Sequence, residues 1–176
     1  MSRNFVRLLV SLILVGSYFL LPRYGFTFHG DIAGHFLYPL SHANIWHLAG
    51  NILCLWVLRC PLHIFITYII AVLCSFLPSF CLFDCIVNGS FAMADMPTYG
   101  FSGVLFAMVG ISWGRIHRFK DMILRNKWIL IIPAFLPHIN FLIHLYCLLM
   151  GYAYGTIINP THPFIPNSCA KKSATS

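Results

Sequence analysis

The chain has 176 residues, of which 59% are hydrophobic and only 9% are charged, and its mean hydropathy is +0.81. Soluble domains carry about 25% charged residues, so this composition excludes a soluble globular domain and indicates a protein of the lipid bilayer. The net charge of +7 comes without interleaved aromatic residues, so we expect no nucleic-acid partner.

Five apolar stretches predict the membrane crossings, and they cover residues 5–22, 43–58, 62–83, 101–113 and 128–158. A crossing needs roughly 20 apolar residues, and the last stretch has room for a short fifth helix and a sixth. It is interrupted by Pro133, Pro137, His138 and Asn140. Because proline cannot continue a helix without losing a hydrogen bond, we place the break near residues 137–140. The prediction is an all-α, polytopic bundle of six transmembrane helices.

The basic residues predict the orientation of this bundle. In a zigzag of six crossings, every lysine and arginine except Arg23 falls on the side of the N-terminus, as the positive-inside rule requires. We therefore expect a single membrane domain over residues 1–176, with short cytoplasmic N- and C-terminal tails. The short loops favour the inner membrane of a bacterium.

The seven cysteines lie mostly in apolar stretches and form no C-x-x-C pair. They are read as small hydrophobic residues, and we expect neither a metal ion nor another cofactor. Cys81 and Cys85 lie near one membrane face and could pair if that face is oxidising, which the sequence leaves open.

Polar residues at membrane depth are functional candidates, and the first pair lies in "SHANIWHLAGNILCLW". His47 and Asn51 are four residues apart, so both project from one face of a helix. Their N–H groups could stabilise an oxyanion in a water-poor site. Taken alone, the pair is more typical of a polar contact between two helices.

The second candidate lies in "YGFSGVLFAMVGISWG", where Ser102 stands between Gly100 and Gly103 at the start of an apolar run. A stripe of small residues follows at helical spacing and allows close approach of another helix: Gly103, Ala107, Gly110 and Gly114. Phe106, one turn on, shares the face of Ser102. A serine in such a stripe is either a packing residue or a nucleophile.

The third candidate is His144, which shares one helical stripe with Gly151 and Gly155. If the two glycine stripes meet, the His144 imidazole could take the proton of Ser102 as a general base. A single buried histidine is more often structural. The chain has four aspartates and no glutamate, and no acid completes a triad, so the arrangement predicts a Ser–His dyad.

Together these segments resemble the rhomboid family of intramembrane serine proteases, over residues 35–158. "HANIWHLAGN" is similar to the H-x4-H-x3-N segment of the family's second helix, with His42, His47 and Asn51. "GFSG" with Phe106 resembles the fourth helix, and "HLYCLLMGYAYG" resembles the sixth.

The resemblance implies a role for each matching residue. Ser102 would be the nucleophile and His144 the general base, and Asn51 and His47 would bind the oxyanion with the Ser102 backbone N–H. Phe106 would stack on His144, and the supporting residues would be His42, Gly100, Gly103, Gly151 and Gly155. The substrates implied are other proteins of the bilayer, cut in or near a transmembrane segment.

The sequence departs from the family in two places. Ala33-Gly34 stands where the first outer loop usually has Trp-Arg, and Cys147 replaces a glycine, which is expected to widen the contact between the fourth and sixth helices.

Two alternatives to an active protease stay open. One is an inactive rhomboid-like protein that binds transmembrane clients. The other is a small transporter or channel with a polar path of His47, Asn51 and His144. Against the transporter, the chain has neither an internal repeat nor a chain of carboxylates.

Overall fold

A computed structural model describes residues 2–27, 29–58, 63–80, 85–87, 89, 96–116, 121, 123–124, 127–128 and 139–158. Its principal elements are α1 (Arg3–Leu20), α2 (Ile32–Leu37), the 3₁₀ helix η1 (Tyr38–Leu40), α3 (Ile45–Val57), α4 (Ile64–Ser75), α6 (Ser102–Arg115) and α8 (Phe141–Ile158). The β-structure within these ranges is one isolated antiparallel bridge between Phe26 and Thr98. The predicted fifth helix and Cys81 lie outside the described residues.

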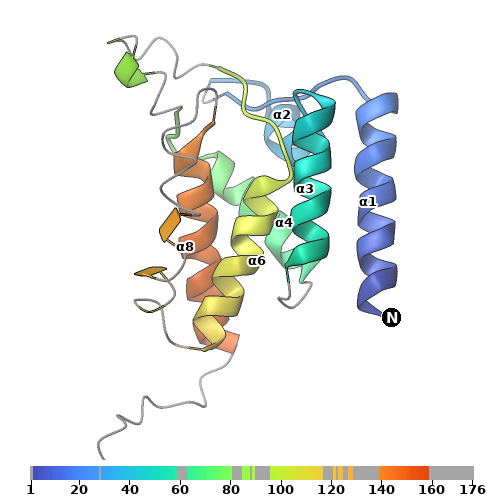
Figure 1. The fold of residues 1–176 in the computed structure, drawn as a ribbon. Helices are drawn as coiled ribbons and strands as arrows, with labels where there is room; N and C mark the ends of the chain where they lie inside the picture. The colour runs from blue at the N-terminus through green and yellow to red at the C-terminus, as the bar shows by residue number, and fades with distance from the viewer. Residues whose placement is uncertain are drawn as a thin grey trace, which may run out of the picture.

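The long helices stand side by side, and α2 and η1 lie across one end of them (Figure 1). Helices α3, α6 and α8 begin at that end, whereas α1 and α4 run towards it (Figure 1). The contacts agree, because Arg7 near the start of α1 donates to the Leu58 carbonyl just beyond the end of α3. The first turns of α3, α6 and α8 therefore lie at one end of the bundle.

Helices α3 and α4 are shorter than the apolar stretches 43–58 and 62–83 that predicted them, whereas α6 has about the length of its stretch, 101–113. Helices α3, α4 and α6 have 13, 12 and 14 residues, which is ~20 Å at 1.5 Å per residue. Within the described ranges, α1 and α8 are long and apolar enough to span a bilayer by themselves. The apolar stretch 62–83 is longer than α4 because the helix ends at Ser75, three residues before Pro78.

Helices α6 and α8 pack backbone against backbone. Four glycines, two on each helix, lie so close to the facing backbone that a Cβ atom would not fit: Gly110, Gly114, Gly151 and Gly155. Gly151 lies against Ala107, and Gly155 against Ile111, so the two helices keep one register and run parallel. The two glycine stripes noted in the sequence are thus in contact.

Cys147 does not prevent this contact. It is fully buried one turn above Gly151, and a Cβ atom on Gly103 would lie 3.3 Å from the Cys147 sulfur. Because Gly103 has no side chain, there is space for the Cys147 thiol between the helices. The expected widening of the contact between α6 and α8 is therefore not seen at Gly151 and Gly155.

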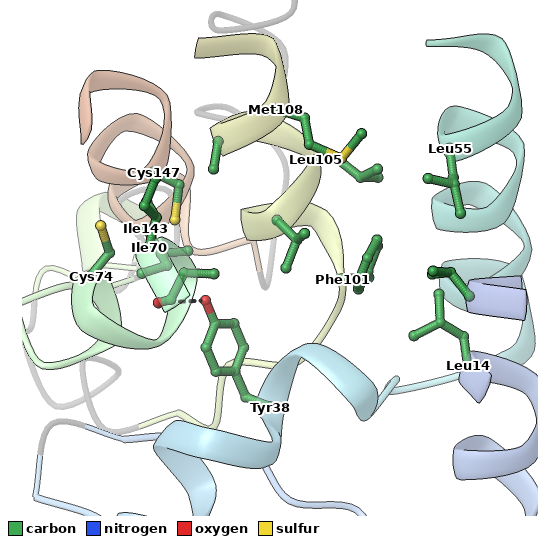
Figure 2. Close-up of a cluster of buried hydrophobic side chains, with 14 of the residues drawn as sticks. Leu14, Tyr38, Leu55, Ile70, Cys74, Phe101, Leu105, Met108, Ile143 and Cys147 are labelled. Carbon is green, nitrogen blue, oxygen red and sulfur yellow. Dashed lines mark hydrogen bonds between the residues drawn. The ribbon is translucent and has the colours of Figure 1, made fainter. Parts of the chain in front are cut away.

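The core that joins these helices to α2 and η1 is formed by large buried side chains (Figure 2). Phe101, just before α6, faces Leu14 of α1 and Leu55 of α3 across this core (Figure 2). Tyr38 of η1 is 1% exposed, and its hydroxyl donates to the Ala71 carbonyl of α4 at 3.0 Å (Figure 2). This core fixes η1 against α4.

The presence of Ala33-Gly34, where the family usually has Trp-Arg, has a steric explanation. Ala33 and Gly34 belong to α2, and a Cβ atom on Gly34 would lie 2.6 Å from the Gly25 carbonyl oxygen. The backbone of residues 25–26 occupies the space that a side chain at position 34 would need.

Substitution of Gly151 by alanine tests the packing of α6 against α8. The new methyl group would meet the Ala107 backbone, so the helices must separate, and we expect a loss of about 1–3 kcal/mol in unfolding free energy. Thermal unfolding in detergent measures this. The matched control is Gly50→Ala on α3, where no atom in the described part of the chain lies within 4 Å of the Cβ position, and it should be neutral or stabilising. Equal midpoints for the two variants would contradict this account of the packing.

Candidate active site

The candidate site lies where α3, α6 and α8 begin. The first turn of a helix has backbone N–H groups without intrahelical partners, so helix starts favour negative charge. Asn44 caps α3 by accepting a hydrogen bond from the His47 backbone N–H at 2.9 Å. Ser102 is the first residue of α6, and His144 lies in the first turn of α8.

The Ser102 hydroxyl and the His144 ring form a hydrogen bond between α6 and α8. The distance from Ser102 Oγ to His144 Nε2 is 2.7 Å. His144 is 8% exposed, whereas Ser102 is half-buried. A neutral imidazole with an unprotonated Nε2 can accept the hydroxyl proton, which is the geometry a general base needs.

Phe106 holds the plane of the His144 ring. The two rings are stacked, with centroids 4.5 Å apart and an interplanar angle of 10°. The second ring nitrogen of His144, Nδ1, is buried and has no hydrogen-bond partner among the described residues. Among the described residues, it is therefore the face of Phe106 that orients the imidazole.

His47 and Asn51 of α3 converge on the backbone just before Ser102. A Cβ atom on Gly100 would lie 2.7 Å from His47 Nε2 and 3.4 Å from Asn51 Nδ2. Asn51 is 6% exposed, and its Nδ2 has no hydrogen-bond partner in the described part of the chain. A buried amide donor without a partner costs about 1–3 kcal/mol, so this N–H group is a candidate for contact with a substrate.

His42 contacts both the backbone before Ser102 and the ring of His47. Its Nε2 accepts a weak hydrogen bond of 3.5 Å from the Phe101 backbone N–H, and its ring packs edge to face on His47 at 5.3 Å. The pKa of His42 is lowered to about 4, mainly by burial and to a smaller extent by the neighbouring His47. His42 is therefore neutral at physiological pH and keeps Nε2 free to accept this bond.

Comparison with known proteins gives the family. A model described as the Rhomboid domain matches residues 29–161, which is more than half of the chain and contains every residue of the candidate site. The chain belongs to the rhomboid family. Rhomboid proteins are integral membrane proteins and are generally serine intramembrane proteases. None of the curated proteins matches this rhomboid chain.

Several residues that shape this rhomboid site were not singled out in the sequence. The Tyr38 carbonyl accepts from the Gly100 backbone N–H at 3.0 Å, which fixes the segment before Ser102. Asn140, noted only as an interruption of an apolar stretch, caps α8. An asparagine just before an apolar helical run is the N-cap signal that could have identified it.

A second serine–histidine contact has its hydrogen bond in the opposite direction. His35 Nδ1 lies 3.0 Å from Ser75 Oγ, but that hydroxyl donates to the Val72 carbonyl at 2.6 Å. The serine oxygen is therefore the acceptor and the histidine the donor. The His35 ring is stacked between Phe26 and Phe76, so this pair ties α2 to the end of α4.

Gly100→Ala tests how closely the backbone approaches His47. Gly100 has a φ of 115°, and the added methyl group would lie 2.6 Å from His47 Cε1. We expect a loss of about 1–3 kcal/mol of stability from the backbone conformation alone, with steric repulsion in addition. The control is Gly89→Ala, because Gly89 also has a positive φ, 58°, but no atom of the described residues lies within 4 Å of its Cβ position. The midpoint of thermal unfolding should be clearly lower for Gly100→Ala than for this control. The reverse order would refute the packing of His47 against Gly100.

Proposed function

We propose that this rhomboid protein is an active intramembrane serine endopeptidase with a Ser102–His144 dyad. The observation that carries the proposal is the 2.7 Å contact between Ser102 Oγ and His144 Nε2. A serine hydroxyl is a weak nucleophile until an adjacent base accepts its proton. A pure client-binding protein has no need for this contact.

The reaction proceeds in two steps. His144 Nε2 takes the Ser102 proton while Oγ attacks the scissile carbonyl carbon, which gives a tetrahedral oxyanion. The imidazolium then donates this proton to the departing amine, and the acyl group stays on Ser102 as an ester. A water molecule, deprotonated by His144, hydrolyses the ester and restores the serine.

The oxyanion is stabilised by donors that are in place before the substrate binds. We assign this role to Asn51 Nδ2, the His47 ring and the Ser102 backbone N–H. Asn51 Nδ2 has no hydrogen-bond partner among the residues that the structure describes, which supports the assignment. The position of Ser102 at the start of α6 supports it as well. Such donors strengthen their interaction as charge develops in the transition state.

The remaining residues hold this arrangement. Phe106 orients His144, and His42 supports Phe101 and His47. Gly100 lets the α3 side chains approach the backbone, while the other small residues keep α6 and α8 in register: Gly103, Gly151 and Gly155.

We propose that the substrates are membrane proteins cut in or near a transmembrane segment, and that residues 1–176 form one membrane domain of six crossings with cytoplasmic termini, in a bacterial inner membrane. The parallel course of α6 and α8 supports this topology. The end of α6 and the start of α8 lie at opposite ends of the bundle, so the chain must return between them (Figure 1).

A fluorophosphonate probe tests the dyad. The purified wild-type protein should form a covalent adduct, and the Ser102→Ala and His144→Ala variants should form none. The matched control is Ser17→Ala on α1, whose hydroxyl donates to backbone carbonyls and should not affect labelling. Failure of a folded wild-type protein to react would overturn the proposal and favour the inactive, client-binding alternative.

Asn51→Ala tests the oxyanion donor. We expect cleavage of a transmembrane reporter to slow by about 10²–10³ with little change in the unfolding midpoint, because a donor to the transition state is lost. Asn4→Ala, which removes an exposed amide on α1, is the control. An unchanged cleavage rate for Asn51→Ala would leave this residue a structural role only.

A further inference from the structure

The side chain of Asn140 connects three segments that are distant in sequence. It is 5% exposed, and its Nδ2 lies 3.0 Å from Ser79 Oγ and 3.0 Å from Thr98 Oγ1. Its Oδ1 accepts from the Ile143 backbone N–H at 3.3 Å. All the polar atoms of the amide group are thus used at one buried point.

The chemistry of the partners fixes how this amide is oriented. A backbone N–H can only donate, so the side-chain oxygen of Asn140 must face Ile143. The amide nitrogen then faces the two hydroxyls and gives one hydrogen to each. The oxygen caps α8, while the nitrogen reaches outside this helix.

One of those hydroxyls belongs to the segment that leads to the nucleophile. Thr98 is four residues before Ser102, and its backbone forms both hydrogen bonds of the bridge to Phe26, at 2.9 and 3.1 Å. Gly100, two residues later, is held by the Tyr38 carbonyl. Thr98 is therefore the point at which Asn140 contacts the anchored chain just before α6.

The other end of the amide belongs to the helix that carries the base. Asn140 directly precedes α8, and Ile143, whose N–H it caps, is the neighbour of His144. The glycine contacts between α6 and α8 restrain the distance between the helices along their length. Asn140 adds a restraint at the end where Ser102 and His144 meet.

We propose that Asn140 is a positioning residue for the dyad: its amide links Thr98 to the first turn of α8 and so sets the register of His144 against Ser102. The proposal rests on the function proposed above. A cap alone stabilises a helix by about 1 kcal/mol, and serine performs that task as well as asparagine. Only the donor pair of the amide reaches Ser79 and Thr98.

This difference separates the two roles experimentally. Asn140→Ser introduces a hydroxyl that can still cap α8 but removes both amide N–H donors. Thr98→Val removes the hydroxyl that accepts from Asn140 and leaves the cap intact. We expect each to slow labelling by the fluorophosphonate probe roughly ten- to a hundredfold, since small misplacements of catalytic groups have effects of this size. The double variant should be no slower than Asn140→Ser, because that variant has already lost the Asn140–Thr98 hydrogen bond that Thr98→Val removes.

Two controls accompany these variants. Thr98→Ser restores the hydroxyl and should recover labelling. Thr67→Val removes a buried threonine hydroxyl that, within the described part of the chain, donates to carbonyls of its own helical turn, and this variant should label at the wild-type rate.

The pH dependence of labelling distinguishes positioning from partial unfolding. A displaced His144 shifts the midpoint of the pH profile, whereas loss of folded protein lowers the rate equally at every pH.

A measurement without catalysis makes the inference independent of activity. The double variant Ser102→Cys, His144→Cys is oxidised with copper phenanthroline, and the cross-linked peptides are identified by mass spectrometry. We expect a lower yield of this cross-link when Asn140→Ser is added. If the wild-type protein is not labelled but the yield falls, the proposed function fails and the positioning role stands. Wild-type labelling and an unchanged cross-link in Asn140→Ser would overturn the positioning role.

Discussion

The contact between the backbones of α6 and α8 is the constraint on which the rest of this structure depends. In a bilayer the hydrophobic effect does not drive helices together, so close packing of small residues must do so. Gly110, Gly114, Gly151 and Gly155 allow that packing, and the parallel register that they impose brings two helix starts to the same level. The serine and the histidine are the residues at those starts.

The end of the bundle where α3, α6 and α8 begin is held by hydrogen bonds. There the chain is irregular, and buried polar groups need partners that a helix no longer supplies. The Tyr38 carbonyl holds Gly100, the Tyr38 hydroxyl holds α4, and Asn140 holds Thr98. Glycine packing thus sets the distance between α6 and α8, and these hydrogen bonds fix the segments that lead into the two helices.

The family and the helical character of the chain could be predicted from the sequence, because local spacing carries them. His47 and Asn51 share a face, and so do His144 and Gly151, whatever the rest of the chain does. The partners of Asn140 could not be predicted, since Ser79 and Thr98 are 61 and 42 residues away along the chain. The apolar stretch 62–83 overestimates the length of α4, because hydropathy does not register that this helix ends at Ser75, before Pro78.

The stacking of Phe106 on His144 has a consequence for charge. In the proposed reaction the imidazole becomes a cation, and no carboxylate among the described residues lies beside it to balance that charge. The face of the Phe106 ring carries the negative part of an aromatic quadrupole and lies parallel to the imidazole at 4.5 Å. A cation–π interaction of this kind contributes about 0.5–2 kcal/mol and strengthens as water is excluded. Phe106 therefore offers the imidazolium an electrostatic counterpart without placing a second ionised group in the membrane.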